Sequence, residues 1–203
     1  MARIVENPDD EVIAAWTAER LRGALAAGGD IAVTVPGGST PFPILERLAA
    51  ADLPWPRVSV WPGDDRLVPE AHAASNVGKI RALLEPAGAR IVPLNEDALP
   101  PHFALAWLGM GGDGHIASLF PNIDPRADDP LPVRRLTPDP LPPEAPFDRI
   151  SLTIPALLDS DALMFVIRGA DKRAVLDAAL RGENDLPIAR LLRAARQPVT
   201  CFC

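Results

Sequence analysis

Residues 103–115 read Phe-Ala-Leu-Ala-Trp-Leu-Gly-Met-Gly-Gly-Asp-Gly-His, an apolar run followed by a glycine-rich turn. The apolar run is typical of a buried strand. The turn has four glycines in six residues, so its backbone can bend sharply and approach a ligand closely. His115 follows at once, and histidine is the side chain best suited to accept a proton near neutral pH. The stretch therefore predicts a general base, His115, beside a small bound molecule.

Short apolar runs alternate with helical patterns on both sides of this stretch. Helical spacing of apolar residues predicts helices at residues 8–27, around 44–48, and at 77–84, 172–180 and 187–195. Apolar runs predict further strands at residues 31–35, 57–61, 90–94, 131–136, 149–154, 162–167 and 199–202. The alternation predicts an α/β fold with a mainly parallel, Rossmann-like, doubly wound sheet and helices on both faces.

The length of the chain suits a single domain, residues 1–203, and its 48% apolar residues are enough for a sizeable core. Residues from about 121 to 147 are rich in proline, which excludes a long helix and predicts an excursion from the sheet. We expect the apolar stripes of the first helix and of the last two helices to face the core. Their members are Val12, Ile13, Trp16, Leu21, Leu25, Leu176, Leu180, Leu191 and Leu192.

The composition excludes several classes of partner. A net charge of −7 argues against nucleic acid or an anionic membrane, although a few clustered cations can still bind a small anion. No apolar run reaches the roughly 20 residues of a membrane span, and no signal-peptide pattern opens the sequence, so we expect a cytoplasmic protein. Cys201 and Cys203 are spaced too widely on a predicted strand for an easy disulfide, and no spacing indicates a zinc site.

Two further segments follow predicted strands and can bind an anion at the same edge of the sheet. Gly37-Gly38-Ser39-Thr40-Pro41 offers backbone N–H groups, two hydroxyls and a helix N-terminus, which together favour a phosphate. The alternative is a tight turn in which a hydroxyl only caps the helix. In residues 63–69, Arg66 can grip a phosphate, and Asp64 and Asp65 can orient Arg66 or bind sugar hydroxyls. The alternative there is an exposed turn with a weak ion pair.

Three other features are less specific. Lys172 opens a predicted helix, where a lysine is unfavourable unless an anion is near, although a plain surface lysine is the alternative. The glycine turn formally matches G-x-G-x-x-G, but Pro121 interrupts the helix that a dinucleotide site needs. His72 and His102 lie in loops without such a turn, so we expect structural roles for them. A structural role is also the alternative for His115.

Taken together and in this order, the segments resemble the 6-phosphogluconolactonase family. Residues 37–41 are similar to its Gly-Gly-Ser-Thr-Pro loop, and residues 63–69 to its Gly-Asp-Glu-Arg-x-Val-Pro segment, which is followed by a match at Ser75-Asn76. Residues 108–121 match its central signature almost throughout. Later blocks match at residues 149–155 and at Gly169 with Lys172, so the resemblance covers most of the chain from residue 33 to 172.

The resemblance implies hydrolysis of 6-phosphogluconolactone to 6-phosphogluconate in sugar-phosphate oxidation, with no metal and no organic cofactor. It implies that His115 activates a water molecule, and that Asp113 orients His115 or only shapes the turn. Backbone N–H groups of the glycine turn are candidates to stabilise the oxyanion. The partner is then a small anionic sugar-phosphate lactone. The residues implied in binding this substrate are Gly37, Gly38, Ser39, Thr40, Asp64, Arg66 and Lys172, of which Gly38, Ser39, Thr40, Arg66 and Lys172 would hold the phosphate.

The chain departs from the family pattern at three places. Asp65 replaces a glutamate, residues 95–102 are so few that a helix usual in the family is reduced or missing, and the C-terminus lacks the usual tryptophan. Two other functions stay open. Glucosamine-6-phosphate deaminases or isomerases share the fold, but they resemble Phe-Asn-Glu-Pro where this chain has Ser118-Leu119-Phe120-Pro121. A non-catalytic sugar-phosphate sensor would keep the phosphate loop without turnover.

Overall fold

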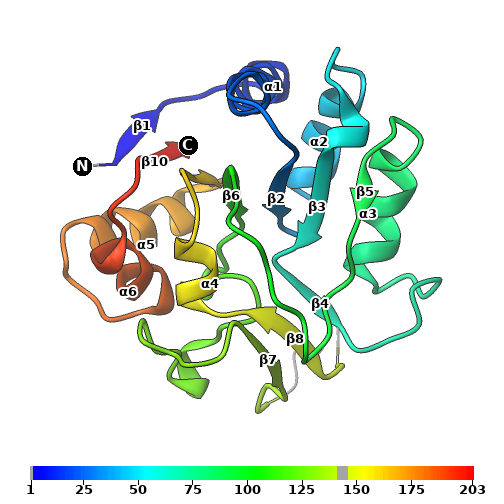
Figure 1. The fold of residues 1–203 in the computed structure, drawn as a ribbon. Helices are drawn as coiled ribbons and strands as arrows, with labels where there is room; N and C mark the ends of the chain where they lie inside the picture. Colours follow the sequence, from blue (N-terminus) through cyan, green and yellow to red (C-terminus); the bar gives the residue numbers. More distant parts are fainter. Residues whose placement is uncertain (1, 141–145) are drawn as a thin grey trace.

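The computed structural model describes residues 2–140 and 146–203 (Figure 1). Within these residues the main sheet has seven strands in the order β1-β10-β9-β6-β2-β3-β5, and every pairing in it is parallel. Its strands are β1 (Arg3–Val5), β2 (Ile31–Val35), β3 (Val58–Pro62), β5 (Arg90–Ile91), β6 (Leu105–Leu108), β9 (Leu163–Val166) and β10 (Val199–Phe202). The predicted α/β fold with a mainly parallel sheet is confirmed.

Helices cover both faces of this sheet (Figure 1). One face carries α1 (Asp10–Ala26), α2 (Pro41–Ala49) and α3 (Asn76–Leu84), and the other carries α4 (Ile154–Leu158), α5 (Ala170–Leu180) and α6 (Pro187–Ala194). Short 3-10 helices lie at η1 (Trp55–Arg57) and η2 (Pro121–Ile123). Alternate side chains of each strand enter opposite cores: Leu105 and Trp107 pack toward α1–α3, whereas Ala106 and Leu108 pack toward α4–α6.

A second, antiparallel sheet lies beside the carboxyl ends of the main strands. It has the order β4-β8-β7 and consists of β4 (Asp64–Arg66), β7 (Val133–Leu136) and β8 (Arg149–Leu152). The predicted strand at residues 149–154 therefore ends early and belongs to this sheet rather than the parallel one, because Ile154 already begins α4. No strand was predicted within residues 63–69, because the three charged residues of β4 have no apolar pattern that would indicate a strand.

Several predicted boundaries also change. The first helix begins at Asp10 rather than Pro8, because the Asp9 carboxylate caps it by accepting a hydrogen bond from the Val12 N–H at 2.8 Å. Val12 and Leu180, expected in the core, are 50% and 37% exposed at the outer edges of their stripes. Of the predicted strand 90–94, only Arg90 and Ile91 form strand β5, although the Val92 N–H still donates to the Val60 carbonyl at 2.9 Å. The strand β1 has only three residues and was not predicted.

The proline-rich excursion contains η2 and β7, and its residues 141–145 lie outside the described part of the chain. Residues 95–102 contain no helix, as the sequence indicated. Both cysteines are free thiols, with Cys201 buried in the core between the sheet and α4–α6. In the described residues, no helix is long and apolar enough to cross a membrane.

Candidate active site

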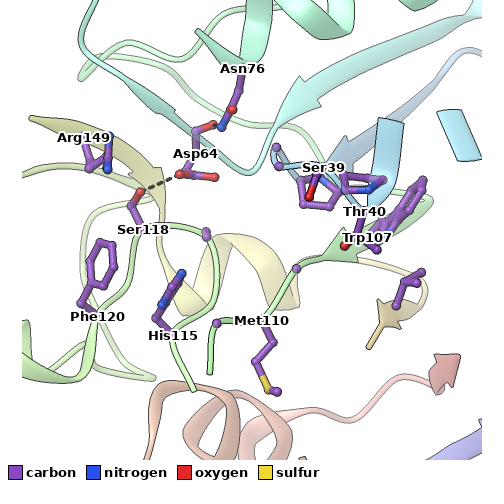
Figure 2. Close-up of a pocket in the computed structure, with 18 of the residues that line it drawn as sticks. Ser39, Thr40, Asp64, Asn76, Trp107, Met110, His115, Ser118, Phe120 and Arg149 are labelled. Atoms are coloured by element: carbon purple, nitrogen blue, oxygen red, sulfur yellow. Dashed lines mark hydrogen bonds between the residues drawn. The ribbon is translucent and has the colours of Figure 1, made fainter. Parts of the chain in front are cut away.

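Strands β2, β6 and β9 end at one cavity of about 490 Å³, because the carboxyl ends of parallel strands meet at the same edge of a sheet (Figure 2). The second sheet closes another side with β4 and β8. Of the predicted site residues, all except Asp113 line this cavity. They are Gly37, Gly38, Ser39, Thr40, Asp64, Arg66, His115 and Lys172, which come from segments far apart in the sequence.

His115 lines the cavity, and Asp113, which does not line it, contacts the imidazole at Nδ1. The Asp113 Oδ1 atom lies 2.6 Å from His115 Nδ1 and accepts a second hydrogen bond from the His115 backbone N–H at 3.2 Å. The bond to the imidazole lowers the pKa of Asp113, so the carboxylate stays ionised and favours a proton on Nδ1. The Phe120 ring packs against the imidazole with 4.6 Å between ring centroids. Nε2 is therefore the nitrogen left to act as a base.

At two positions of the turn only glycine fits, because a Cβ atom there would collide with a neighbouring side chain. A Cβ on Gly111 would lie 2.2 Å from His115 Nδ1, and one on Gly114 would lie 2.7 Å from Leu186 Cδ1. Gly114 also has a φ of +78°, which side chains rarely adopt. The Gly111 N–H donates to the His115 carbonyl at 2.9 Å, and the Gly114 N–H donates to the Gly111 carbonyl at 3.1 Å. Because these two N–H groups already donate hydrogen bonds within the turn, they are not candidates to stabilise the oxyanion.

The loop at residues 37–40 forms the opposite wall (Figure 2). Thr40 occupies the N-cap position of α2, yet neither it nor another side chain in the described residues caps the helix. The alternative that this hydroxyl only caps α2 is therefore wrong for Thr40. Gly37 packs directly on Asn76, since a Cβ there would lie 2.1 Å from Asn76 Oδ1. The loop is thus fitted closely to the N-terminus of α3.

Arg66 is held at its guanidinium end and faces the cavity. Its Nη1 donates to the Ala74 carbonyl at 2.9 Å and to Asn76 Oδ1 at 2.8 Å, while its buried Nε has no hydrogen-bond partner in the described residues. Arg149 is its direct partner across β4 and β8, and it also lines the cavity. Burial and the charge of Arg66 lower the pKa of Arg149. Two neighbouring cations of this kind favour an anion bound beside them.

Asp64 has a different environment from Asp113. The Ser118 hydroxyl donates to Asp64 Oδ2 at 2.6 Å, the contact dashed in Figure 2. Burial nevertheless raises the pKa of Asp64 above its ordinary value. The two carboxyl groups near His115 therefore have pKa values displaced in opposite directions, a pattern common where proton transfer occurs.

The sequence did not single out several residues that line the cavity: Asn76, Trp107, Ser118, Phe120 and Arg149. Four of these residues lie in the segments that resemble the lactonases, and this resemblance could have pointed to them: Asn76, Ser118, Phe120 and Arg149. Nothing in a linear pattern showed which of those residues would face the cavity. Arg149 faces the cavity through the antiparallel pairing of β4 with β8, whereas Ser118 and Phe120 follow the glycine turn. Asn76 lies at the N-terminus of α3.

Known proteins resemble this chain in both sequence and fold. The family described as glucosamine-6-phosphate isomerases/6-phosphogluconolactonase matches residues 10–100 and 93–200. A 6-phosphogluconolactonase of Pseudomonas aeruginosa is 38% identical over 206 residues, covering 90% of this chain and 86% of the relative. The crystal structure of a 6-phosphogluconolactonase from Shewanella baltica is 25% identical, with a TM-score of 0.87 over 100% of this chain and 97% of that chain. The chain belongs to the glucosamine-6-phosphate isomerase/6-phosphogluconolactonase family.

Proposed function

We propose that this protein hydrolyses 6-phospho-D-glucono-1,5-lactone to 6-phospho-D-gluconate. The named relatives support this reaction, and the cavity suits it. The observation that carries the proposal is the placement of an imidazole oriented by Asp113 in the same cavity as Arg66, Arg149 and Lys172. A phosphate held by the cations would leave the lactone ring within the cavity that His115 lines.

The anionic end of the substrate binds to the wall formed by the loop at residues 37–40 and the three cations. Arg66 presents a buried Nε that has no partner in the described residues, and Lys172 adds charge from the first turn of α5. Charge-assisted hydrogen bonds are each worth roughly 1.5–3 kcal/mol, so a few suffice to fix the ligand. Anchoring also removes translational freedom before the reaction begins.

The chemical step uses His115 as the general base. Water attacks the lactone carbonyl carbon, His115 Nε2 takes one proton from that water, and the ionised Asp113 stabilises the imidazolium that forms. The bond between the carbonyl carbon and the ring oxygen then breaks, and the imidazolium gives its proton to the ring oxygen, which becomes a hydroxyl while His115 returns to its neutral form. The product is an open-chain acid that keeps its phosphate. Positioned general bases of this kind typically contribute about 10²–10⁴-fold in rate.

We further propose that residues 1–203 act as one catalytic domain. The activity belongs to the oxidative pentose phosphate pathway or a related route that oxidises sugar phosphates. A charged sugar phosphate is costly to move through an apolar membrane, which favours action in the cytoplasm. The deaminase alternative is disfavoured because Phe120 packs against His115 at the position where a deaminase is expected to carry a glutamate.

The experiment compares lactone hydrolysis with its uncatalysed background, using 6-phosphogluconolactone and unphosphorylated D-glucono-1,5-lactone. We expect catalysis well above background that strongly favours the phosphorylated lactone, and loss of kcat in His115→Ala with binding of 6-phosphogluconate retained. Binding of 6-phosphogluconate without turnover would establish the sensor alternative. Release of ammonia from glucosamine 6-phosphate would establish the deaminase instead.

A further inference from the structure

Asp65 lies one residue before Arg66 and points away from the solvent. Its side chain is buried, with 6% exposed. In the described residues its carboxylate accepts four hydrogen bonds. Oδ1 accepts the N–H groups of Arg66 at 2.8 Å and Asn76 at 2.6 Å, while Oδ2 accepts the Val77 N–H at 2.9 Å and the Ser75 hydroxyl at 3.3 Å. One carboxylate thus joins strand β4 to the first turn of α3.

The Asp65 carboxylate fixes Asn76, and Asn76 in turn binds Arg66. Asn76 begins α3, and its backbone N–H is fixed by Asp65. The side chain of Asn76 accepts from Arg66 Nη1 at 2.8 Å, donates to the Asp64 carbonyl at 2.8 Å and packs against Gly37. Figure 2 shows Asn76 reaching from α3 toward Asp64. The chain of contacts therefore runs from Asp65 through Asn76 to the cation and to the glycine loop.

We propose that Asp65 is a positioning residue, which sets the Arg66 guanidinium for the phosphate of the substrate by anchoring Asn76. The proposal rests on the proposed function. Asp65 does not line the cavity itself, so it acts through Asn76 and Arg66 rather than on the substrate. A carboxylate suits this place because the N-terminus of a helix favours negative charge and has unpaired N–H groups.

The substitution Asp65→Asn separates this role from simple packing, because Asn has nearly the same size. Each carboxylate oxygen accepts at least one backbone N–H, so an amide nitrogen would face an N–H in either orientation. We expect the N-terminus of α3 to shift and Asn76 to release Arg66. The KM for 6-phosphogluconolactone should rise about 10-fold or more, with kcat changed by less than about 3-fold. The KM for unphosphorylated gluconolactone should not change.

Two variants complete the design. Asp65→Glu keeps both acceptor oxygens and should restore the KM to within about 3-fold of wild type, since the charge is retained and only one methylene is added. Arg81→Ala is the matched control on the same helix. Arg81 pairs with Glu70 and Glu85 on the outer side of α3, so its loss loosens the helix without touching Asp65 or Asn76. We expect Arg81→Ala to leave both KM values unchanged.

Calorimetric binding of 6-phosphogluconate is measured alongside the kinetics, so that the positioning role does not depend on turnover. Weaker binding in Asp65→Asn, with recovery in Asp65→Glu, supports the proposal. An unchanged KM and Kd in Asp65→Asn overturns it, as does an equal loss on both lactones or an equal effect of Arg81→Ala. If wild type hydrolyses neither lactone, the proposed function fails and the Kd values alone decide the role of Asp65. If wild type also fails to bind 6-phosphogluconate, both proposals fall.

Discussion

Gly111 lies directly against the imidazole of His115, and a Cβ added to Gly111 would be 2.2 Å from both Nδ1 and Cε1. The same atom would be 2.7 Å from Asp113 Oδ1. The absence of a side chain at residue 111 is therefore what allows the histidine and the aspartate to meet. This relationship explains why the turn carries glycine at a position where its φ is not in the left-handed region.

Gly111→Ala should prevent His115 from acting as the general base, although the substitution removes no functional group. The new methyl group must displace the imidazole or Asp113, which breaks their 2.6 Å contact and moves Nε2. We expect kcat to fall by about 10²-fold or more, within the range of a lost general base, while 6-phosphogluconate still binds. Gly112→Ala is the matched control, because a Cβ there meets nothing within 4 Å. Equal kcat values for the two variants would contradict this account.

Asp113→Asn should lower kcat through the wrong tautomer of His115. The amide nitrogen can donate to Nδ1, which moves the ring proton to Nε2 and removes the base. We expect a loss of about 10²–10⁴-fold in kcat with little change in KM. The double variant Asp113→Asn, His115→Ala should be no slower than His115→Ala, because both residues act as one unit. Additive losses in steady-state kinetics would show that Asp113 acts independently.

Arg66→Ala should raise KM rather than lower kcat. The guanidinium lines the cavity and is held by Asn76 Oδ1 and the Ala74 carbonyl, so it is prepared for an anion before the substrate arrives. We expect KM for the phosphorylated lactone to rise about 10- to 100-fold. The penalty should shrink on D-glucono-1,5-lactone, which lacks the phosphate. Similar penalties on both lactones would place Arg66 at the reacting carbonyl instead.

His102 should make folding stability depend on pH. Its Nδ1 lies 2.7 Å from Asp159 Oδ1 and its Nε2 lies 3.0 Å from Asp161 Oδ1, and these contacts raise the pKa of His102. Its contribution to stability is therefore fully present below the unfolded pKa of about 6.5 and is lost as pH rises through the raised folded value. The side chains are about half exposed, so we expect at most about 1 kcal/mol.

The measurement is urea unfolding of wild type and His102→Gln, from below pH 6.5 to above the raised pKa of His102. The difference in unfolding free energy between the two proteins should be largest at acid pH and should decrease as the pH rises. A difference that grows with pH would show that the ring is held neutral. Lactone hydrolysis should be the same in both proteins, because His102 does not line the cavity.

The core of the fold could be predicted because each long element carries a strong local pattern. Residues 31–35 were predicted as a strand and form β2 with the same bounds, since a continuous apolar run buried on both faces has few other structures. The elements that were missed are short or charged. Strand β1 has three residues, β4 is Asp-Asp-Arg, and α4 is a five-residue helix with a proline near its start. Their structure comes from partners far away in the sequence.

The residues of the candidate site also fall into two groups, those that the sequence predicted and those that it did not. His115, the loop at residues 37–40 and Arg66 were predicted because glycines, hydroxyls and a charge follow strands at a known edge of such sheets. Arg149 and Ser118 were not, because each faces the cavity only through contact with another segment. Arg149 lies opposite Arg66 in the second sheet, and Ser118 contacts Asp64 across 54 residues. No local pattern carries that information.

By itself the sequence determined the alternation of strands and helices, the family resemblance and the residues able to hold a phosphate or accept a proton. Those properties are local, because they depend on periodicity, on glycine conformation and on side-chain chemistry. Only the tertiary structure decided that Asp65 faces the first turn of α3 rather than the cavity, and that Asp64 and Arg149 face the cavity. In a strand, neighbouring side chains point to opposite faces, so the register of β4 against β8 decides which charges meet the ligand.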